Sequence, residues 1–282
     1  MPTQVDLLKS YGLEIRGVQG QHLLIDPNMQ RKIVDRLGVE EGDRVLEIGP
    51  GLGALTGELL KRKARVVAVE KDERFVRVLK KEFREWIPGR LQIVHGDILE
   101  FDFKKAFPPK KGDKIKVISN LPYYVTGPTL FHLFEFSREI SVAVLTMQKE
   151  VAMRILASPG TKDYGRLSVS VRYFADAEYA FDIPRQCFTP QPEVDSSVLV
   201  LRFRKTPTGL KKKEEKFLFH LIQAAFCQRR KTLLHLLVRD PAIGSTRQAL
   251  AATFKSLGFS ETVRGEELLL KDFLSLGEAL QD

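Results

Sequence analysis

The sequence predicts an α/β fold with a mostly parallel sheet, followed by a smaller all-helical domain. Three observations lead to this prediction. A short apolar run ends in a glycine-rich turn and a helical pattern over residues 45–61. Apolar runs then alternate with helical patterns, which is typical of βαβ units. Beyond residue 209 the apolar residues recur only at helical spacing.

The expected elements follow from these periodicities. Strands are expected over residues 42–49, 66–70, 91–94, 115–118, 141–147, 178–183 and 196–203. Helices are expected over residues 28–37, 54–61, 73–83, 149–156, 166–174, 214–226, 232–238, 245–257 and 266–280. The three prolines between residues 184 and 192 predict a fixed loop rather than an edge strand.

The glycine-rich turn Gly49-Pro50-Gly51-Leu52-Gly53 is the first candidate binding site. Glycines let the backbone turn sharply and approach a small molecule closely. Glu70 ends the next apolar run, where a carboxylate can accept hydrogen bonds from both ribose hydroxyls of a nucleoside. The spacing Gly-x-Gly-x-Gly favours a ligand without a pyrophosphate over a dinucleotide. The alternative is a tight turn that binds no ligand.

A glycine or a polar residue follows the apolar run of each of four predicted strands, namely Gly49, Glu70, Asp97 and Asn120. The carboxyl ends of parallel strands meet at one edge of an open α/β sheet, and ligands bind there. We therefore expect these four residues to lie at one ligand site. Capping of four separate strands is the less economical interpretation.

The tetrapeptide Asn120-Leu121-Pro122-Tyr123 suggests chemistry on a base amine. Such an amine is a poor nucleophile because its lone pair is delocalised into the ring. The side-chain oxygen of Asn120 and the main-chain oxygen of Leu121 can accept from its N–H groups and free that lone pair. Pro122 fixes the turn, and Tyr123 offers a face for stacking, which is worth roughly 1–3 kcal/mol. Phe188 is a candidate for the opposite face, or else a core residue; a plain surface turn is the alternative for the tetrapeptide.

Composition narrows the class of protein further. The 282 residues include 45 Lys and Arg against 36 Asp and Glu, a net charge of +9, which favours a polyanionic partner, nucleic acid first, over a merely basic surface. No run of 18 apolar residues predicts a membrane span, and no secretory signal is recognisable, so we expect a cytoplasmic protein. Its two cysteines are expected to be free, and no metal site is expected.

Together, the glycine-rich turn and the tetrapeptide resemble those of the N6-adenine rRNA dimethyltransferases. Several further stretches resemble the kasugamycin-sensitivity type, which modifies small-subunit rRNA. These are residues 20–24, 148–151, 164–168, 188–196 and 226–233. The resemblance implies a Rossmann-like methyltransferase fold with a mostly parallel seven-stranded sheet. It also implies dimethylation, by S-adenosylmethionine (SAM), of two adjacent adenosines in the 3′-terminal hairpin loop of small-subunit (16S) rRNA, together with a role in subunit maturation.

Carried onto this chain, the resemblance implies a set of site residues. The cofactor contacts would be His22, Leu24, Gly49, Gly51, Glu70, Asp97 and Asn120. Catalysis would rest on Asn120, Leu121, Pro122, Tyr123 and Phe188. We expect RNA to enter a cleft between the domains and to meet Arg202, Arg204, Lys211, Lys212, Arg229, Arg230 and Lys231, which would otherwise be solvated charges.

The expected organisation has three parts. Residues 1–31 form an N-terminal leader that contributes to the cofactor or RNA site, residues 32–205 the SAM-binding catalytic domain, and residues 209–282 a helical RNA-binding domain. The expected partner is small-subunit rRNA within a 30S-type ribosomal subunit precursor, and the protein is expected to act as a monomer. Val18-Gln19-Gly20-Gln21 departs from the basic-Phe-Gly-Gln run of the family, and Tyr124-Val125-Thr126-Gly127 is unusual.

Two other functions remain open at this point. The large-subunit rRNA methyltransferases that give macrolide resistance share the cofactor site and the tetrapeptide. A non-catalytic ribosome assembly factor could keep the fold without turnover. A nicotinamide dehydrogenase is a remote third option, because no His or Tyr stands at a plausible hydride site.

Overall fold

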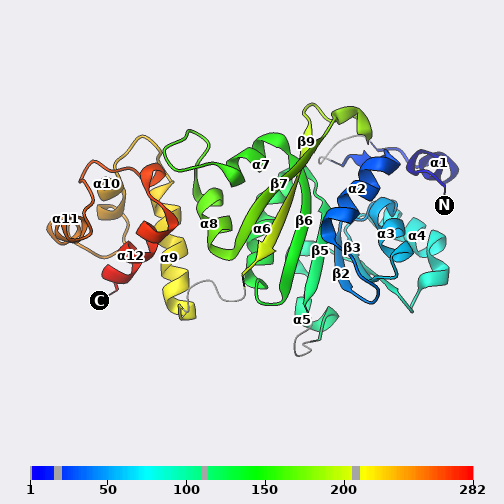
Figure 1. Cartoon of the computed structure of the whole chain (residues 1–282), viewed down its shortest axis with the longest axis horizontal. Helices are drawn as coiled ribbons and strands as arrows, with labels where there is room; N and C mark the ends of the chain where they lie inside the picture. Colours follow the sequence, from blue (N-terminus) through cyan, green and yellow to red (C-terminus); the bar gives the residue numbers. More distant parts are fainter. Residues whose placement is uncertain (1, 16–20, 109–113, 205–209, 282) are drawn as a thin grey trace. The chain divides into compact units, whose positions relative to one another are not determined.

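The computed structural model describes residues 2–15, 21–108, 114–204 and 210–281. The chain divides into two compact units, each coloured along the sequence in Figure 1. The first unit comprises Met1–Ala152 and Asp176–Lys205, and the second comprises Met153–Ala175 and Thr206–Asp282.

The first unit is built on a seven-stranded sheet with the strand order β4-β3-β2-β5-β6-β9-β7. Neighbouring strands from β4 to β6 are parallel, and β9 is antiparallel to β6. The predicted seven-stranded, mostly parallel sheet is therefore confirmed. The strands are β2 (Arg44–Ile48), β3 (Arg65–Glu70), β4 (Leu91–His95), β5 (Ile115–Asn120), β6 (Ile140–Gln148), β7 (Ala175–Ile183) and β9 (Ser196–Phe203).

Helices connect the strands of this unit. The predicted ones are α2 (Pro27–Leu37), α3 (Ala54–Lys61) and α4 (Glu73–Glu82), whereas α5 (Phe103–Ala106) and α6 (Thr126–Glu135) were not among the expected helices. The side chain of Asp26 caps α2 by accepting from the N–H groups of Asn28 and Met29 at 2.8 and 3.0 Å. Such a cap is worth about 0.5–2 kcal/mol, so the sequence marks where this helix begins.

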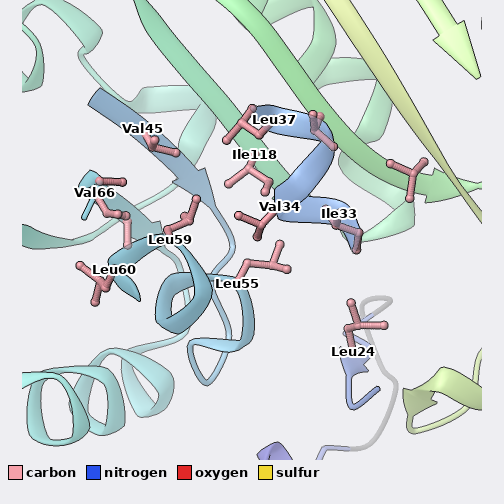
Figure 2. Packing of buried hydrophobic residues seen from close by; sticks show 14 of the residues in the cluster. Leu24, Ile33, Val34, Leu37, Val45, Leu55, Leu59, Leu60, Val66 and Ile118 are labelled. Atoms are coloured by element: carbon pink, nitrogen blue, oxygen red, sulfur yellow. The ribbon is translucent and has the colours of Figure 1, made fainter. Parts of the chain in front are cut away.

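The core lies between α2, α3 and the sheet, where branched side chains interdigitate (Figure 2). Ile33 and Val34 of α2 are fully buried, as are Val45 of β2 and Ile118 of β5. Each such side chain contributes roughly 1.5–3 kcal/mol when it leaves water. This packing fixes the carboxyl ends of the strands, which carry the candidate site.

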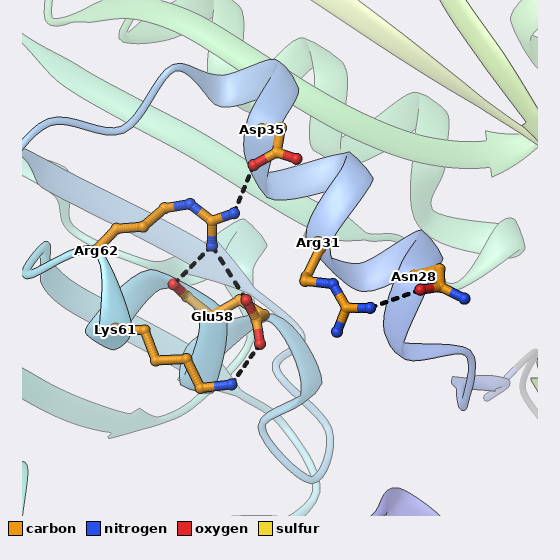
Figure 3. Close-up of polar contacts among 6 residues, drawn as sticks. All are labelled: Asn28, Arg31, Asp35, Glu58, Lys61 and Arg62. Carbon is orange, nitrogen blue, oxygen red and sulfur yellow. Dashed lines mark hydrogen bonds and ion pairs between the residues drawn. The ribbon is translucent and has the colours of Figure 1, made fainter.

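The solvent-facing sides of α2 and α3 are joined by charges (Figure 3). Arg62 pairs with Asp35 at 2.5 Å and with Glu58 at 3.2 Å, and Lys61 pairs with Glu58 at 2.6 Å. The Glu58 side chain is only 11% exposed, whereas Asp35 and Lys61 are each 64% exposed. Ion pairs with such exposed partners are worth little individually, so they add to the helix packing rather than determine it.

The N-terminal segment contains a helix that the sequence analysis did not expect. Residues 4–10 form the helix α1 (Gln4–Ser10), which begins with a capping box between Thr3 and Asp6. Leu7 of α1 belongs to a second hydrophobic cluster that also contains Leu52 of the glycine-rich turn. The N-terminal segment therefore packs against the turn that it was predicted to serve.

The prediction of a loop without a strand at 184–192 is wrong in one respect. Phe188–Thr189 form a short strand, β8, which pairs in antiparallel fashion with β1 (Leu23–Leu24). The prolines do not prevent this pairing, because neither residue of β8 is a proline and both keep their N–H groups.

The second unit brings together segments from distant parts of the chain. Its helices are α7 (Lys149–Leu156), which starts in the first unit, α8 (Arg166–Phe174), α9 (Lys212–Ala225), α10 (Leu233–Val238), α11 (Arg247–Ser256) and α12 (Leu270–Ala279). The ring of Phe174 on α8 stacks on that of Phe219 on α9, and the Tyr164 hydroxyl donates to the main-chain oxygen of Leu268 at 2.9 Å. Residues 153–175 therefore group with the C-terminal helices, although the sequence analysis assigned them to the catalytic domain.

Four further expectations concern the C-terminal helix, the cysteines, the domain boundary and membrane spans. The predicted helix over 266–280 is a 3-10 turn (Gly265–Glu267) followed by α12, because the side chain of Asp272 accepts from the Leu269 N–H at 2.7 Å and starts a new helix. Cys187 is buried and Cys227 exposed, and both are free thiols. The predicted domain boundary at residues 205–209 lies outside the described residues. Among the residues that are described, no helix is long and apolar enough to cross a bilayer.

Candidate active site

The glycine-rich turn after β2 needs its glycines for conformation and for space. Gly51 and Gly53 have φ of +59° and +84°, a region that other residues rarely adopt. A Cβ on Gly51 would lie 2.7 Å from a methyl carbon of Leu23, and one on Gly53 would lie 2.4 Å from the ring of Phe83. Any larger residue would push the N-terminal segment or α4 away from the turn.

Glu70 ends β3 and is held by the glycine-rich turn. Its carboxylate accepts from the N–H of Gly51 at 3.0 Å and from that of Asp72 at 2.8 Å. The residue is only 6% exposed, and this burial raises the pKa of the carboxyl, while the two main-chain donors oppose the shift. Each oxygen keeps a second lone pair, so the group can accept from a ligand without losing its support.

Glu47 lies inside β2 and is a second buried carboxyl at the same place. It is 1% exposed, and the Thr56 hydroxyl donates to it at 2.6 Å. Burial raises the pKa of Glu47 to about 8, and the nearby Glu70 adds to this rise. Glu47 is therefore mostly neutral at pH 7, which spares the interior a second negative charge.

Asn120, the last residue of β5, is oriented by a distant segment. Its side-chain nitrogen donates to the main-chain oxygen of His22 at 3.0 Å. This contact leaves the side-chain oxygen of Asn120 as an acceptor for another donor. The His22 ring is itself fixed, because its Nδ1 lies 2.7 Å from the main-chain oxygen of Pro190.

Tyr123 is fixed at both ends of its side chain. The residue opens a 3-10 turn (Tyr123–Val125), and its hydroxyl lies 2.9 Å from that of Ser196 at the start of β9. Its ring packs against the His22 ring, with centroids 5.5 Å apart and an angle of 33° between the planes. Burial raises the pKa of Tyr123, so its phenol stays neutral.

These groups surround one pocket, which encloses about 710 Å³ of non-protein space, part of it open solvent. We call the carboxyl ends of β2, β3 and β5 that border it the pocket edge. The pocket contains most of the predicted cofactor and catalytic positions. Its lining comprises Gln4, Gln21, His22, Leu23, Leu24, Glu47, Gly49, Pro50, Gly51, Ala54, Leu55, Glu70, Phe75, Asn120, Leu121, Pro122, Tyr123 and Phe188.

Comparison with known proteins identifies the family. The model of the ribosomal RNA adenine dimethylases matches residues 12–280. The chain belongs to this family. The ribosomal RNA small subunit methyltransferase A of Ligilactobacillus salivarius is 39% identical, with 97% of this chain and 93% of that protein covered. The protein of the same name from Enterococcus faecalis is 40% identical, with 98% and 94% covered.

Solved structures agree with the assignment to the adenine dimethylase family. A dimethyladenosine transferase from Plasmodium falciparum superposes with a TM-score of 0.77 at 27% identity, covering 90% of this chain and 95% of that one. The 23S rRNA methyltransferase ErmE has a TM-score of 0.66 at 24% identity, covering 92% of this chain and all of that one. The second likeness shows that the fold is shared.

Within this adenine dimethylase, Phe188 belongs both to the hydrophobic core and to the pocket wall. It is 3% exposed and belongs to the main hydrophobic cluster, yet it also lines the pocket. Its partner across the β1–β8 pair is Leu24, which lines the same pocket. A stacking role for Phe188 stays a prediction, and the buried setting means that only part of its ring can face a ligand.

Asp97 is the predicted cofactor residue that does not line the pocket of this family member. It follows β4, where its carboxylate pairs with the ammonium of Lys71 at 2.8 Å and accepts from the Leu99 N–H at 3.0 Å. The hydrogen bond from Lys71 and that from Leu99 lower the pKa of Asp97. Its role in cofactor binding stays a prediction.

Several predicted RNA-binding cations of this dimethylase have acidic neighbours. Arg204 pairs with Asp176 at 2.5 Å, Arg202 lies 3.9 Å from Glu178, and Lys211 lies 3.9 Å from Glu214. Lys212 is exposed. A contact of any of these cations with RNA stays a prediction.

The run 229–231 divides into two kinds of residue. The Arg229 guanidinium donates to the main-chain oxygens of Lys162 and Tyr164 and lies 3.6 Å from Glu266. Arg230 and Lys231 are exposed, and within the described part of the chain no hydrogen bond or ion pair holds either side chain. Arg229 thus has a structural role that the sequence analysis missed, whereas the other two are available to a partner.

Eight residues that line the pocket were not among the predicted site residues, namely Gln4, Gln21, Leu23, Glu47, Pro50, Ala54, Leu55 and Phe75. Gln4 comes from the unexpected α1, whereas the other seven lie in stretches that the sequence analysis named for other reasons. A helix as short as α1 gives little periodicity, and only the Thr3–Asp6 capping box could have indicated it. Residues 16–20, which include the departure Val18-Gln19-Gly20, lie outside the described residues.

Proposed function

We propose that this chain transfers methyl groups from SAM to the exocyclic amines of two adjacent adenosines in the 3′-terminal hairpin loop of small-subunit rRNA, as a step in ribosome small-subunit maturation. Family membership supports the adenine dimethylase activity, and the names of the relatives support the small ribosomal subunit as the source of the RNA. The observation that carries the proposal is Asn120, oriented by the His22 main chain beside the pocket of the glycine-rich turn.

The pocket fits a nucleoside joined to an amino acid. Glu70 offers acceptors for two ribose hydroxyls, because its carboxylate oxygens are held by main-chain N–H groups and keep lone pairs for further donors. Apolar side chains such as Leu24, Leu55 and Phe75 line the rest of the wall. When SAM is bound, it supplies an electrophilic methyl group on a sulfonium that becomes neutral on transfer.

The residues of the tetrapeptide would hold the attacking amine. The Asn120 side-chain oxygen accepts from one N–H, and the Leu121 main-chain oxygen accepts from the other, which pulls the nitrogen toward tetrahedral geometry. Tyr123 stacks on the base and sets the angle of approach, since its ring is fixed by His22 and Ser196. Orientation of this kind supplies much of the rate enhancement when neither a strong base nor a metal is needed.

The RNA must present an unpaired base to this pocket. An amine inside a duplex cannot reach it, so the target adenosine is flipped out or already lies in a loop. The exposed cations Arg230 and Lys231 are candidates for phosphate contacts. A cleft between the domains as the RNA path, action as a monomer and a cytoplasmic location are likewise predictions.

The test is methyl transfer from labelled SAM to undermethylated small ribosomal subunits, with large-subunit RNA in parallel and the modified nucleosides identified. We expect N6,N6-dimethyladenosine in small-subunit RNA alone. Label only in large-subunit RNA would favour the activity of the macrolide-resistance methyltransferases. The 23S rRNA methyltransferase ErmE shares the fold of this chain. SAM binding without label in either RNA would favour the assembly factor.

A further inference from the structure

The ends of β3 and β4 carry two carboxylates with different partners. The strands are parallel, with Glu70 opposite His95, and Asp97 follows two residues later. Glu70 is held by main-chain N–H groups, whereas Asp97 pairs with the Lys71 ammonium at 2.8 Å. Lys71 directly follows Glu70 in the chain, so one strand end supplies both the candidate ribose acceptor and the partner of the neighbouring carboxylate.

A nucleoside whose ribose was bound to Glu70 would have room to extend its base along the edge of the sheet, toward β4. The next strand on that side is β4, and the described carboxylate nearest its end is Asp97. An exocyclic amine of the base would donate to that carboxylate, for which the Lys71 ammonium already competes. This step rests on the proposed function, because it takes SAM as the ligand.

We propose that Lys71 competes with the base amine of the cofactor for the Asp97 carboxylate, and thereby sets both the affinity and the base selectivity of the pocket. The side chains of Lys71 and Asp97 are 69% and 26% exposed, so the lysine can leave without disturbing the core. Asp97 and, to a lesser degree, Glu100 raise the pKa of Lys71, which keeps the ammonium charged throughout.

The competition affects a 6-amino purine and a 6-oxo purine differently. A 6-amino purine donates to Asp97 and must displace the lysine. A 6-oxo purine carries an acceptor at that position, which an ammonium can satisfy and a carboxylate cannot. Lys71 therefore weakens binding of the adenine ligand and tolerates the 6-oxo analogue, so its removal should raise the discrimination between the two.

The experiment measures binding by calorimetry for wild type, Lys71→Met and the control Lys63→Met. The ligands are S-adenosylhomocysteine and its 6-oxo analogue S-inosylhomocysteine. Lys63 pairs with Glu41 at 2.7 Å, and its side chain is 55% exposed, but it precedes β3 at the opposite end of the strand. The control therefore removes a comparable exposed ion pair away from the pocket.

We expect Lys71→Met to bind S-adenosylhomocysteine about 2- to 5-fold more tightly, which is the range of an exposed ion pair, and to raise the ratio of the two dissociation constants further. Lys63→Met should match wild type. In 1 M salt the gain should shrink, since screening already weakens the pair in wild type. In an Asp97→Asn background, Lys71→Met should have no effect, because the group under competition has lost its charge.

Weaker or unchanged binding in Lys71→Met, with wild type still binding S-adenosylhomocysteine, would overturn the role of Lys71 and leave the proposed function intact. An equal gain in the Asp97→Asn background would also overturn it. Absence of S-adenosylhomocysteine binding to wild type would overturn the proposed function, and the role of Lys71 with it.

Discussion

The pocket edge and the basic run 229–231 were both marked as functional by the sequence, and the structure treats them differently. At the pocket edge Glu70 and Asn120 are bonded to main-chain atoms from other segments. In the basic run, only Arg229 is tied to the fold, through main-chain oxygens and Glu266, while Arg230 and Lys231 are exposed. Groups that act on a small reacting centre are held in advance, whereas groups suited to a polyanion need only charge and exposure.

The strongest test that the pocket edge is shielded from water uses Glu47. Its folded pKa of about 8 lies above the ordinary value of 4.5, so ionisation is penalised in the folded state only. Wild type should lose stability relative to Glu47→Gln as pH rises from about 4.5 to about 8, by roughly 5 kcal/mol in total, and the difference should then level off. Urea unfolding from pH 5 to 9 measures this.

The matched control is Glu58→Gln on α3, where Lys61 and Arg62 lower the pKa of the carboxyl against the opposing effect of burial. Its stability difference from wild type should stay flat above pH 5. If the free energies of unfolding of wild type and Glu47→Gln changed with pH in parallel, Glu47 would be ionised and in contact with water. The pocket edge would then not be shielded, and its contrast with the exposed cations would be lost.

Replacement of Asn120 by Ala tests whether orientation at the pocket edge is catalytic. Loss of a preorganised hydrogen-bonding group should lower methyl transfer roughly 100-fold or more, with RNA binding kept. Label incorporation and RNA retention are measured on the same preparation. Asn28→Ala on α2, where the amide pairs with Arg31 at 2.5 Å, is the control. Full activity of Asn120→Ala would remove the assigned role.

Replacement of Glu70 by Gln tests the charge of the ribose acceptor. Charged acceptors form hydrogen bonds about 1 kcal/mol stronger than neutral ones, so affinity for S-adenosylhomocysteine should fall about fivefold. Calorimetry gives this value, and Glu73→Gln, whose side chain is 61% exposed and pairs with Arg77, should bind as wild type does. Equal affinities for Glu70→Gln and wild type would separate Glu70 from the ligand.

The smallest expected effect concerns the basic run. If about four cations contact phosphates, RNA binding should weaken with salt at a log–log slope of roughly −3 to −4. Joint replacement of Arg230 and Lys231 by Gln should reduce that slope by roughly 1.5, whereas Arg229→Gln should leave it unchanged and cost about 1 kcal/mol of stability. A slope near zero for wild type would rule out the RNA path altogether.

The sequence was sufficient wherever the controlling contacts are local. Helix α3 occupies the predicted residues 54–61, since a glycine-rich turn precedes it and its apolar face is regular. Glu70 was found at the end of its strand because a charged residue ends an apolar run. The carboxyl ends of the parallel strands then placed Gly49, Glu70 and Asn120 at one pocket by topology alone.

The remaining features depend on contacts between distant residues. The partner of Asn120 is a main-chain oxygen 98 positions away, and no side-chain pattern reports on a carbonyl. The ion pair of Lys71 with Asp97 depends on the rotamers of the two side chains, which the sequence does not specify. The role of Arg229 was hidden because its charge resembles that of Arg230 and Lys231, although its partners come from the segment around Tyr164.

The pairing of β1 with β8 bears on how the protein is made. Leu23 pairs with Thr189, a separation of 189 − 23 = 166 positions, so the first wall of the pocket is synthesised long before its partner strand. At about 5–20 residues per second, roughly 10 to 30 seconds pass between them. During translation the N-terminal segment must wait unpaired while the glycine-rich turn and Asn120 emerge. A nascent chain can form the β1–β8 pair only when about two thirds of the polypeptide (189 of 282 residues) has left the ribosome, the particle whose RNA it is proposed to modify.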